Sequence, residues 1–76
     1  MEKAKYDYSK LRGKIREMFK TESAFAEVMG MSRATLSAKL VGKNNWKQDE
    51  ILEAMKILGI SRRYVFDYFF TEEVAI

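Results

Sequence analysis

Four cationic side chains stand in the stretch 31–48, which contains no acidic residue: Arg33, Lys39, Lys43 and Lys47. Acidic residues flank the stretch, with Glu27 before it and Asp49 after it. Such a concentration of positive charge is suited to binding the phosphate groups of nucleic acid. The alternative is a solvated surface segment, because a run of charge is also typical of exposed loops.

Other chemistry is largely excluded by composition. The 76 residues include no cysteine and no histidine, so disulfides and thiolate or imidazole metal ligands are absent, as are the commonest general base and nucleophile. The carboxylates of Asp7, Asp49, Glu50 and Asp67 stand at expected helix starts or solvated positions and form no recognisable catalytic pair. We therefore expect neither an enzyme nor a cofactor.

Two short helices and a tight turn are expected to position the cations. Gly30 is placed to end a helix over about 22–29 in a left-handed conformation, and Ser32 to cap a second helix over about 33–41. Apolar residues would lock the two helices at an angle and leave the second with one exposed face: Ala26, Met29, Met31, Leu36 and Leu40. This succession predicts a helix-turn-helix, whose exposed helix can enter a DNA major groove.

The exposed face of the second helix follows from its period. With Leu36 and Leu40 inward, the opposite face carries small residues that could read bases, namely Ala34 and Ala38 with Thr35 and Ser37 on the flanks. Arg33 stands at the leading end, where a guanidinium can grip guanine in a bidentate fork. Its alternative role is a phosphate contact.

Three further helices are predicted, over about 8–20, 47–58 and 61–70, with residues 71–76 as a tail. Asp7 or Ser9 can cap the first of them, and Asn45 with Gln48 has the spacing of a capping box for the helix over 47–58. The outer face of the helix over 8–20 carries five cations, which we interpret as a solvated face, although some could touch phosphate: Lys10, Arg12, Lys14, Arg16 and Lys20.

The C-terminal segment holds more aromatic residues than one small core can absorb. It includes Tyr64, Phe66, Tyr68, Phe69 and Phe70, followed by Val74 and Ile76. Exposed apolar clusters usually mark interfaces, so this segment is a candidate contact between two copies of the chain. Folding of the same segment back into its own core is an equally open alternative.

Length and charge set the remaining bounds. A chain of 76 residues predicts a single domain, and its net charge of +3 is only mildly basic. There is no signal-peptide pattern and no apolar run near the length of about 18 residues that a membrane span needs. We expect a protein of the bacterial cytoplasm with no membrane contact and no small-molecule ligand.

The order of residues resembles the lambda-repressor/Cro-like family, and is closest to the small Cro-like proteins of phages and prophages. The resemblance is carried by Phe25-Ala26, Met29-Gly30, Ser32, Thr35-Leu36-Ser37 and Leu40-Val41-Gly42-Lys43, and extends to Gln48-Asp49-Glu50-Ile51 and Asp67-Tyr68-Phe69-Phe70. It implies an all-α bundle of about five helices, no cofactor, dimeric operator binding and control of transcription. It also implies backbone phosphate contacts at Ser32, Lys39, Lys43, Asn44, Asn45 and Lys47.

Two residues depart from the pattern of that family. Many members carry glutamine where this chain has Glu22, and a carboxylate there would repel phosphate. We expect Glu22 to complement the helix dipole; the alternatives are that it braces Arg33 or binds an exocyclic amine in the groove. Many members carry an apolar residue where this chain has Lys39. Its stem is expected to cover the core while its ammonium reaches a phosphate.

Two functions remain in competition. The leading hypothesis is a sequence-specific regulator, a Cro-like repressor that occupies pseudo-palindromic double-stranded operator DNA as a homodimer, with the helix over 33–41 in the major groove. The alternative is a protein-interaction module, similar to an antirepressor, that caps another regulator through its C-terminal aromatic segment.

Overall fold

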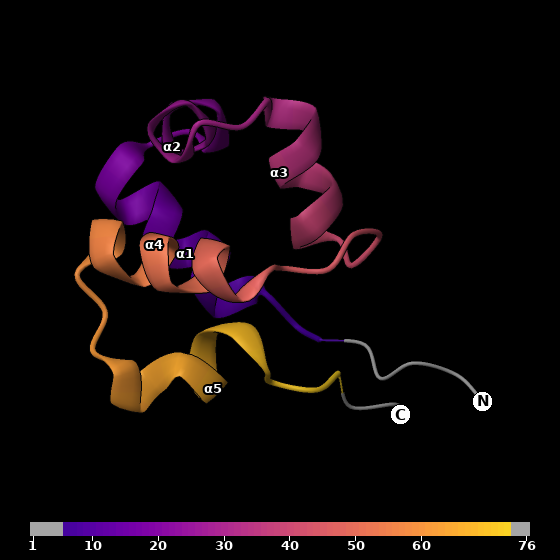
Figure 1. The fold of residues 1–76 in the computed structure, drawn as a ribbon, viewed down its shortest axis with the longest axis vertical. Coiled ribbons are helices and arrows are strands. Elements are labelled where there is room, and N and C mark those ends of the chain that lie inside the picture. Colours follow the sequence, from indigo (N-terminus) through magenta and orange to yellow (C-terminus); the bar gives the residue numbers. More distant parts are fainter. Residues whose placement is uncertain (1–5, 74–76) are drawn as a thin grey trace.

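The fold is all-helical, as the sequence predicts. The structure is a computed structural model that describes residues 6–73, and these form five α-helices and one short 3-10 helix (Figure 1). They are α1 (Ser9–Phe19), α2 (Glu22–Met29), α3 (Arg33–Leu40), α4 (Gln48–Leu58), the 3-10 helix η1 (Arg62–Tyr64) and α5 (Val65–Phe69). The first four begin and end within one residue of their predicted bounds.

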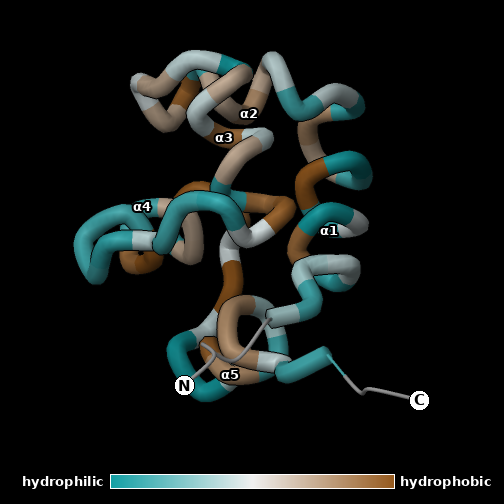
Figure 2. Tube along the Cα trace, turned by 90° about the vertical axis from the view of Figure 1, so that its right-hand side faces the viewer, coloured by the Kyte–Doolittle hydropathy of each residue, from teal (hydrophilic) through white to brown (hydrophobic). Residues whose placement is uncertain are grey.

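One hydrophobic core joins the helices. α1 contributes Leu11 and Ile15, α2 contributes Phe25, and α5 contributes Phe69, all of them fully buried. The core is completed by Tyr8, Ala26, Leu36, Leu40, Ile51, Ala54, Met55 and Leu58. Figure 2 shows the hydrophobic residues of α1 on the side that faces α3 and α4, and its hydrophilic residues on the outer side. This amphipathic pattern explains why α1 buries only one stripe.

The connection between α2 and α3 has the local chemistry that the sequence predicts. Gly30 adopts the left-handed conformation with φ of 75°, and the N–H of Met31 donates to the carbonyl of Ala26 at 3.0 Å. The hydroxyl of Ser32 then accepts from the N–H of Thr35 at 3.0 Å. Both the predicted helix stop and the predicted cap are confirmed, and they place α3 at a steep angle to α2 (Figure 1).

Alanine at Gly30 and alanine at Gly13 are expected to change stability in opposite directions. Gly30 has a positive φ, so a side chain there costs about 1 kcal/mol in free energy of unfolding. Gly13 lies inside α1 with open space around the added Cβ, so Gly13→Ala should stabilise the helix by about 0.5–1 kcal/mol. Urea unfolding of both variants checks this pair. A stabilising Gly30→Ala would contradict the role assigned to the turn.

Three local predictions are corrected. Neither Asp7 nor Ser9 is the N-cap residue of α1; Tyr8 occupies that position without a capping side-chain bond, and Asp7 Oδ1 accepts from the Ser9 N–H at 2.8 Å. The capping box expected between Asn45 and Gln48 is replaced by Glu50, whose carboxylate accepts from the Lys47 N–H at 2.9 Å. The helix predicted over 61–70 is divided into η1 and α5.

The two ends of the described chain are paired. Tyr6 and Glu72 form an isolated antiparallel bridge, and the Asp7 N–H donates to the carbonyl of Thr71 at 2.6 Å. Within residues 6–73 no helix is long and apolar enough to cross a membrane. Val74 and Ile76, expected to extend the aromatic segment, lie outside the described residues.

Candidate interaction surfaces

The exposed side of α3 presents the residues expected to read bases. Arg33, Ala34 and Thr35 are exposed, whereas Ser37 and Ala38 are half-buried. Leu36 and Leu40 are buried on the opposite side, as their spacing predicts. The hydroxyl of Ser32, expected to meet a phosphate, also donates to the Thr35 hydroxyl at 2.9 Å, so the two side chains bind each other at the start of the helix.

Lys39 does not occupy the surface position expected for a phosphate contact. The residue is only 5% exposed, and its ammonium lies 2.8 Å from Glu50 Oε1 and 3.0 Å from the carbonyl oxygen of Asn45. The same ammonium is 5.9 Å from the centre of the Trp46 ring. The expectation that its stem covers the core is correct, but its charge is satisfied inside the protein, so the predicted phosphate contact is corrected.

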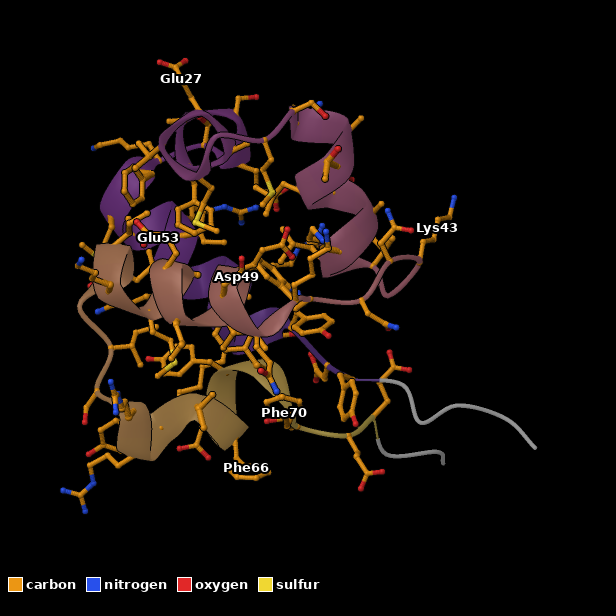
Figure 3. All side chains as sticks on the ribbon, viewed as in Figure 1. Glu27, Lys43, Asp49, Glu53, Phe66 and Phe70 are labelled. Carbon is orange, nitrogen blue, oxygen red and sulfur yellow. The ribbon has the colours of Figure 1, made fainter. Side chains whose placement is uncertain are left out.

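The loop between α3 and α4 keeps the other polar residues at the surface. Lys43, Asn44, Asn45 and Lys47 are all exposed, and Lys43 points away from the bundle in Figure 3. The N–H groups of Lys43 and Asn44 both donate to the carbonyl of Ala38, which folds the loop tightly against the end of α3. Two exposed lysines therefore remain of the three cations predicted after Arg33.

Acidic side chains are also exposed on the helices that precede and follow α3. Asp49 and Glu53 are exposed one turn apart on α4, and Glu27 is exposed on α2 (Figure 3). Glu22 does not brace Arg33; its Oε2 atom lies 3.2 Å from Nε of Arg12. The surface around α3 thus carries both signs of charge.

The C-terminal segment exposes part of its aromatic cluster. Phe66 is 70% exposed and points outward from α5 (Figure 3), and its ring centre lies 5.4 Å from that of Phe70. Phe70 in turn meets Tyr6 edge to face at 5.6 Å. We call Tyr6, Phe66 and Phe70 the aromatic surface. Tyr64, the last residue of η1, is also exposed, two residues before Phe66.

The structure divides the residues of this segment between the surface and the core. Phe69 is only 1% exposed, and its ring meets Trp46 edge to face at 5.1 Å, so its assignment to an interface is corrected. Tyr68 is half-buried, with the ammonium of Lys10 lying 5.1 Å from its ring centre. A short helix has two sides, and only one of them faces solvent.

A groove adjoins the aromatic surface. It has a volume of about 440 Å³ and is lined by Tyr6, Tyr8, Asn45, Trp46, Ile51, Phe69 and Phe70. The Nε1 atom of Trp46 is buried without a hydrogen-bond partner among the described residues. Aromatic walls and an adjoining exposed phenylalanine pair are features of protein-binding surfaces.

Comparison with known proteins places this fold in a family. A family model described as "Protein of unknown function (DUF739)" matches residues 4–72. The chain belongs to the DUF739 family. The DUF739 chain is also similar to the solution structure of the modulator of repression (MOR) of the temperate bacteriophage TP901-1 from Lactococcus lactis. The two share 46% sequence identity with a TM-score of 0.78, over 92% of this chain and 95% of that chain. No curated protein matches significantly.

This relative overturns the leading functional hypothesis. A relative that is a modulator of repression favours the alternative hypothesis of a protein-interaction module. The prediction of a Cro-like repressor that binds operator DNA as a homodimer is therefore wrong, and so is the prediction that double-stranded DNA is the partner. The relation to phage regulatory proteins is confirmed. The physical reason for the error is that a turn and an exposed helix form a scaffold, which does not specify its partner. The positive charge of the stretch 31–48 is also weaker evidence for DNA binding, because the ammonium of Lys39 is buried and paired with Glu50.

Proposed function

We propose that this DUF739 chain is a protein-interaction module that modulates repression by binding another regulatory protein, as an antirepressor does. The similarity to a phage modulator of repression supports the regulatory role. Binding without catalysis is part of the proposal, because the chain contains neither histidine nor cysteine. The partner that we propose is a repressor protein.

The aromatic surface is the proposed contact, and the exposure of Phe66 is the observation that carries it. An aromatic ring left 70% exposed adds little to the core, and a contiguous apolar patch in water favours association. Aromatic side chains also dominate the binding energy of many protein interfaces. The adjoining groove offers a socket for an apolar side chain of the partner.

We further propose that α2, the turn and α3 are a helix-turn-helix of the lambda-repressor-like type. The left-handed Gly30, the Ser32 cap and the burial of Leu36 support this assignment. In this proposal the motif serves as a scaffold. It holds α1 and α4 in the positions against which Trp46 and α5 pack, and so sets the geometry of the aromatic surface.

Truncation of Phe66 tests the proposed contact. We expect Phe66→Ala to weaken binding to the repressor encoded in the same genome by about 30-fold, the effect of losing an interface residue worth about 2 kcal/mol. Isothermal titration calorimetry with the two purified proteins measures this change. In a reporter assay, the variant should lose its effect on repression.

The matched control is Leu52→Ala, which truncates another exposed apolar side chain, 54% exposed on α4. Its affinity should stay within about twofold of the unchanged protein, as for most residues outside the central contact. Equal affinities for Phe66→Ala and the unchanged protein would reject the aromatic surface. Failure of the unchanged chain to bind the repressor at all would reject the proposed function.

A further inference from the structure

The cations on the outer face of α1 are not an ordinary solvated face. Arg12 and Arg16 lie four residues apart on α1, and Lys20, the C-cap residue whose N–H donates to the Arg16 carbonyl, continues this row past the last helical residue. Together with Arg33 at the start of α3 they line a cleft of about 470 Å³, whose remaining wall is the first turn of α2. The cations of α1 and of α3, which are distant in sequence, thus line the same cleft.

The charge of this cleft is poorly compensated. Among the described residues, Glu22 is the only acidic one that lines it, and its Oε2 atom lies 3.2 Å from Nε of Arg12. Arg16, Lys20 and Arg33 take part in no ion pair within residues 6–73. Three like charges around a partly enclosed space raise the local potential and favour an anionic ligand.

We propose that this cleft binds an acidic segment of a protein partner, with the carboxylates of the segment paired to Arg16, Lys20 and Arg33. Arginine forks match carboxylates in a bidentate geometry. Cations four residues apart on a helix advance by about 6 Å, close to the step of about 6.7 Å between alternate side chains of an extended peptide. The spacing of the cations along the row on α1 therefore matches the spacing of alternate acidic side chains along an extended peptide.

An acidic side chain in the cleft favours a peptide over nucleic acid. Glu22 lines the cleft, where it would oppose a continuous phosphate backbone. A peptide can instead place its few carboxylates opposite the cations alone. The cleft runs along α1 to α2 and the start of α3, while Phe66 of the aromatic surface lies on α5, at the opposite end of the bundle from α2 (Figure 1). The two sites are therefore separable.

The test adds a blocked hexaglutamate peptide to the ¹⁵N-labelled full chain at about 0.1 M salt, where the Debye length is about 10 Å, and monitors the amide chemical shifts. We expect saturable shifts at residues of the cleft and none at α5. Arg16→Glu and Arg33→Glu should each weaken the peptide affinity by about tenfold, because each reverses a charge in the cleft. Both residues are exposed, and an acid at the first position of α3 suits the helix dipole, so the variants should fold.

The matched control is Lys56→Glu, an exposed residue on α4 that does not line the cleft and whose replacement changes the net charge equally. It should leave the affinity within about twofold, because exposed charges beyond a Debye length are screened. Equal weakening by all three variants would overturn the proposal, since it would show a non-specific charge effect. So would stronger binding of a 14-base-pair duplex than of the peptide at the same cleft. Neither result would affect repressor binding through Phe66.

Discussion

Replacement of Phe69 by alanine is expected to lower the free energy of unfolding by about 3–5 kcal/mol, the largest effect of any single change considered. The ring is 1% exposed and meets Trp46 at 5.1 Å, so truncation leaves a cavity between α5 and the segment that leads into α4. Small domains have total stabilities of about 5–15 kcal/mol. The variant should therefore be partly unfolded at ordinary temperature.

Urea or thermal unfolding followed by circular dichroism measures this effect. Phe66→Ala is the matched control, because it removes the same side chain from the same short helix at a position that is 70% exposed. Its stability should change by less than about 0.5 kcal/mol. Equal stability losses for the two variants would show that α5 is not oriented as described.

Loss of the Glu50 carboxylate is expected to give the second-largest effect. In Glu50→Ala the ammonium of Lys39, which is 2.8 Å from Glu50 Oε1, would remain in a buried position without its counter-charge. Breaking a buried pair in this way costs about 3–5 kcal/mol when both groups are enclosed. Because the Glu50 side chain is 22% exposed, we expect about 2–3 kcal/mol here.

Removing the other partner should cost less. Lys39→Met keeps an apolar stem in the same space and leaves Glu50 partly hydrated, so the expected loss is less than about 1 kcal/mol. Lys39→Met combined with Glu50→Ala should then be more stable than Glu50→Ala alone. Chemical unfolding of the three variants measures this order. A double variant less stable than Glu50→Ala would exclude the buried charge as the cause.

The same pair makes stability depend on pH. Burial raises the pKa of Glu50. The hydrogen bonds from Lys39 and from the Lys47 N–H, together with the charges of both lysines, lower this pKa by more than burial raises it, so it lies below its ordinary value of 4.5. A carboxyl whose pKa is lowered by folding stabilises the protein above its unfolded pKa, and this contribution disappears as pH falls through the folded value. Stability should therefore decrease below about pH 4.5, and this part of the decrease should be absent in Glu50→Gln.

Much of the fold could be predicted because its signals are local. Thr21 and Ser32 cap their helices through side-chain bonds spanning three residues, and Gly30 and Gly59 end theirs in left-handed conformations. The end of the chain was harder, since α5 has only five residues, too few for a period to separate its two sides. The cationic cleft was also missed, because the row on α1 gives no sign that Arg33 will join it.

The sequence by itself determined the all-α class, the positions of the first four helices and the tight turn before α3. Caps, glycines and apolar spacing act within a few residues, so these features do not need the rest of the molecule. Only the tertiary structure decided that Lys39 is internal while Phe66 is exposed. Both depend on contacts between residues distant in the chain, with Glu50 from α4 beside Lys39 and with Trp46 enclosing Phe69 rather than Phe66.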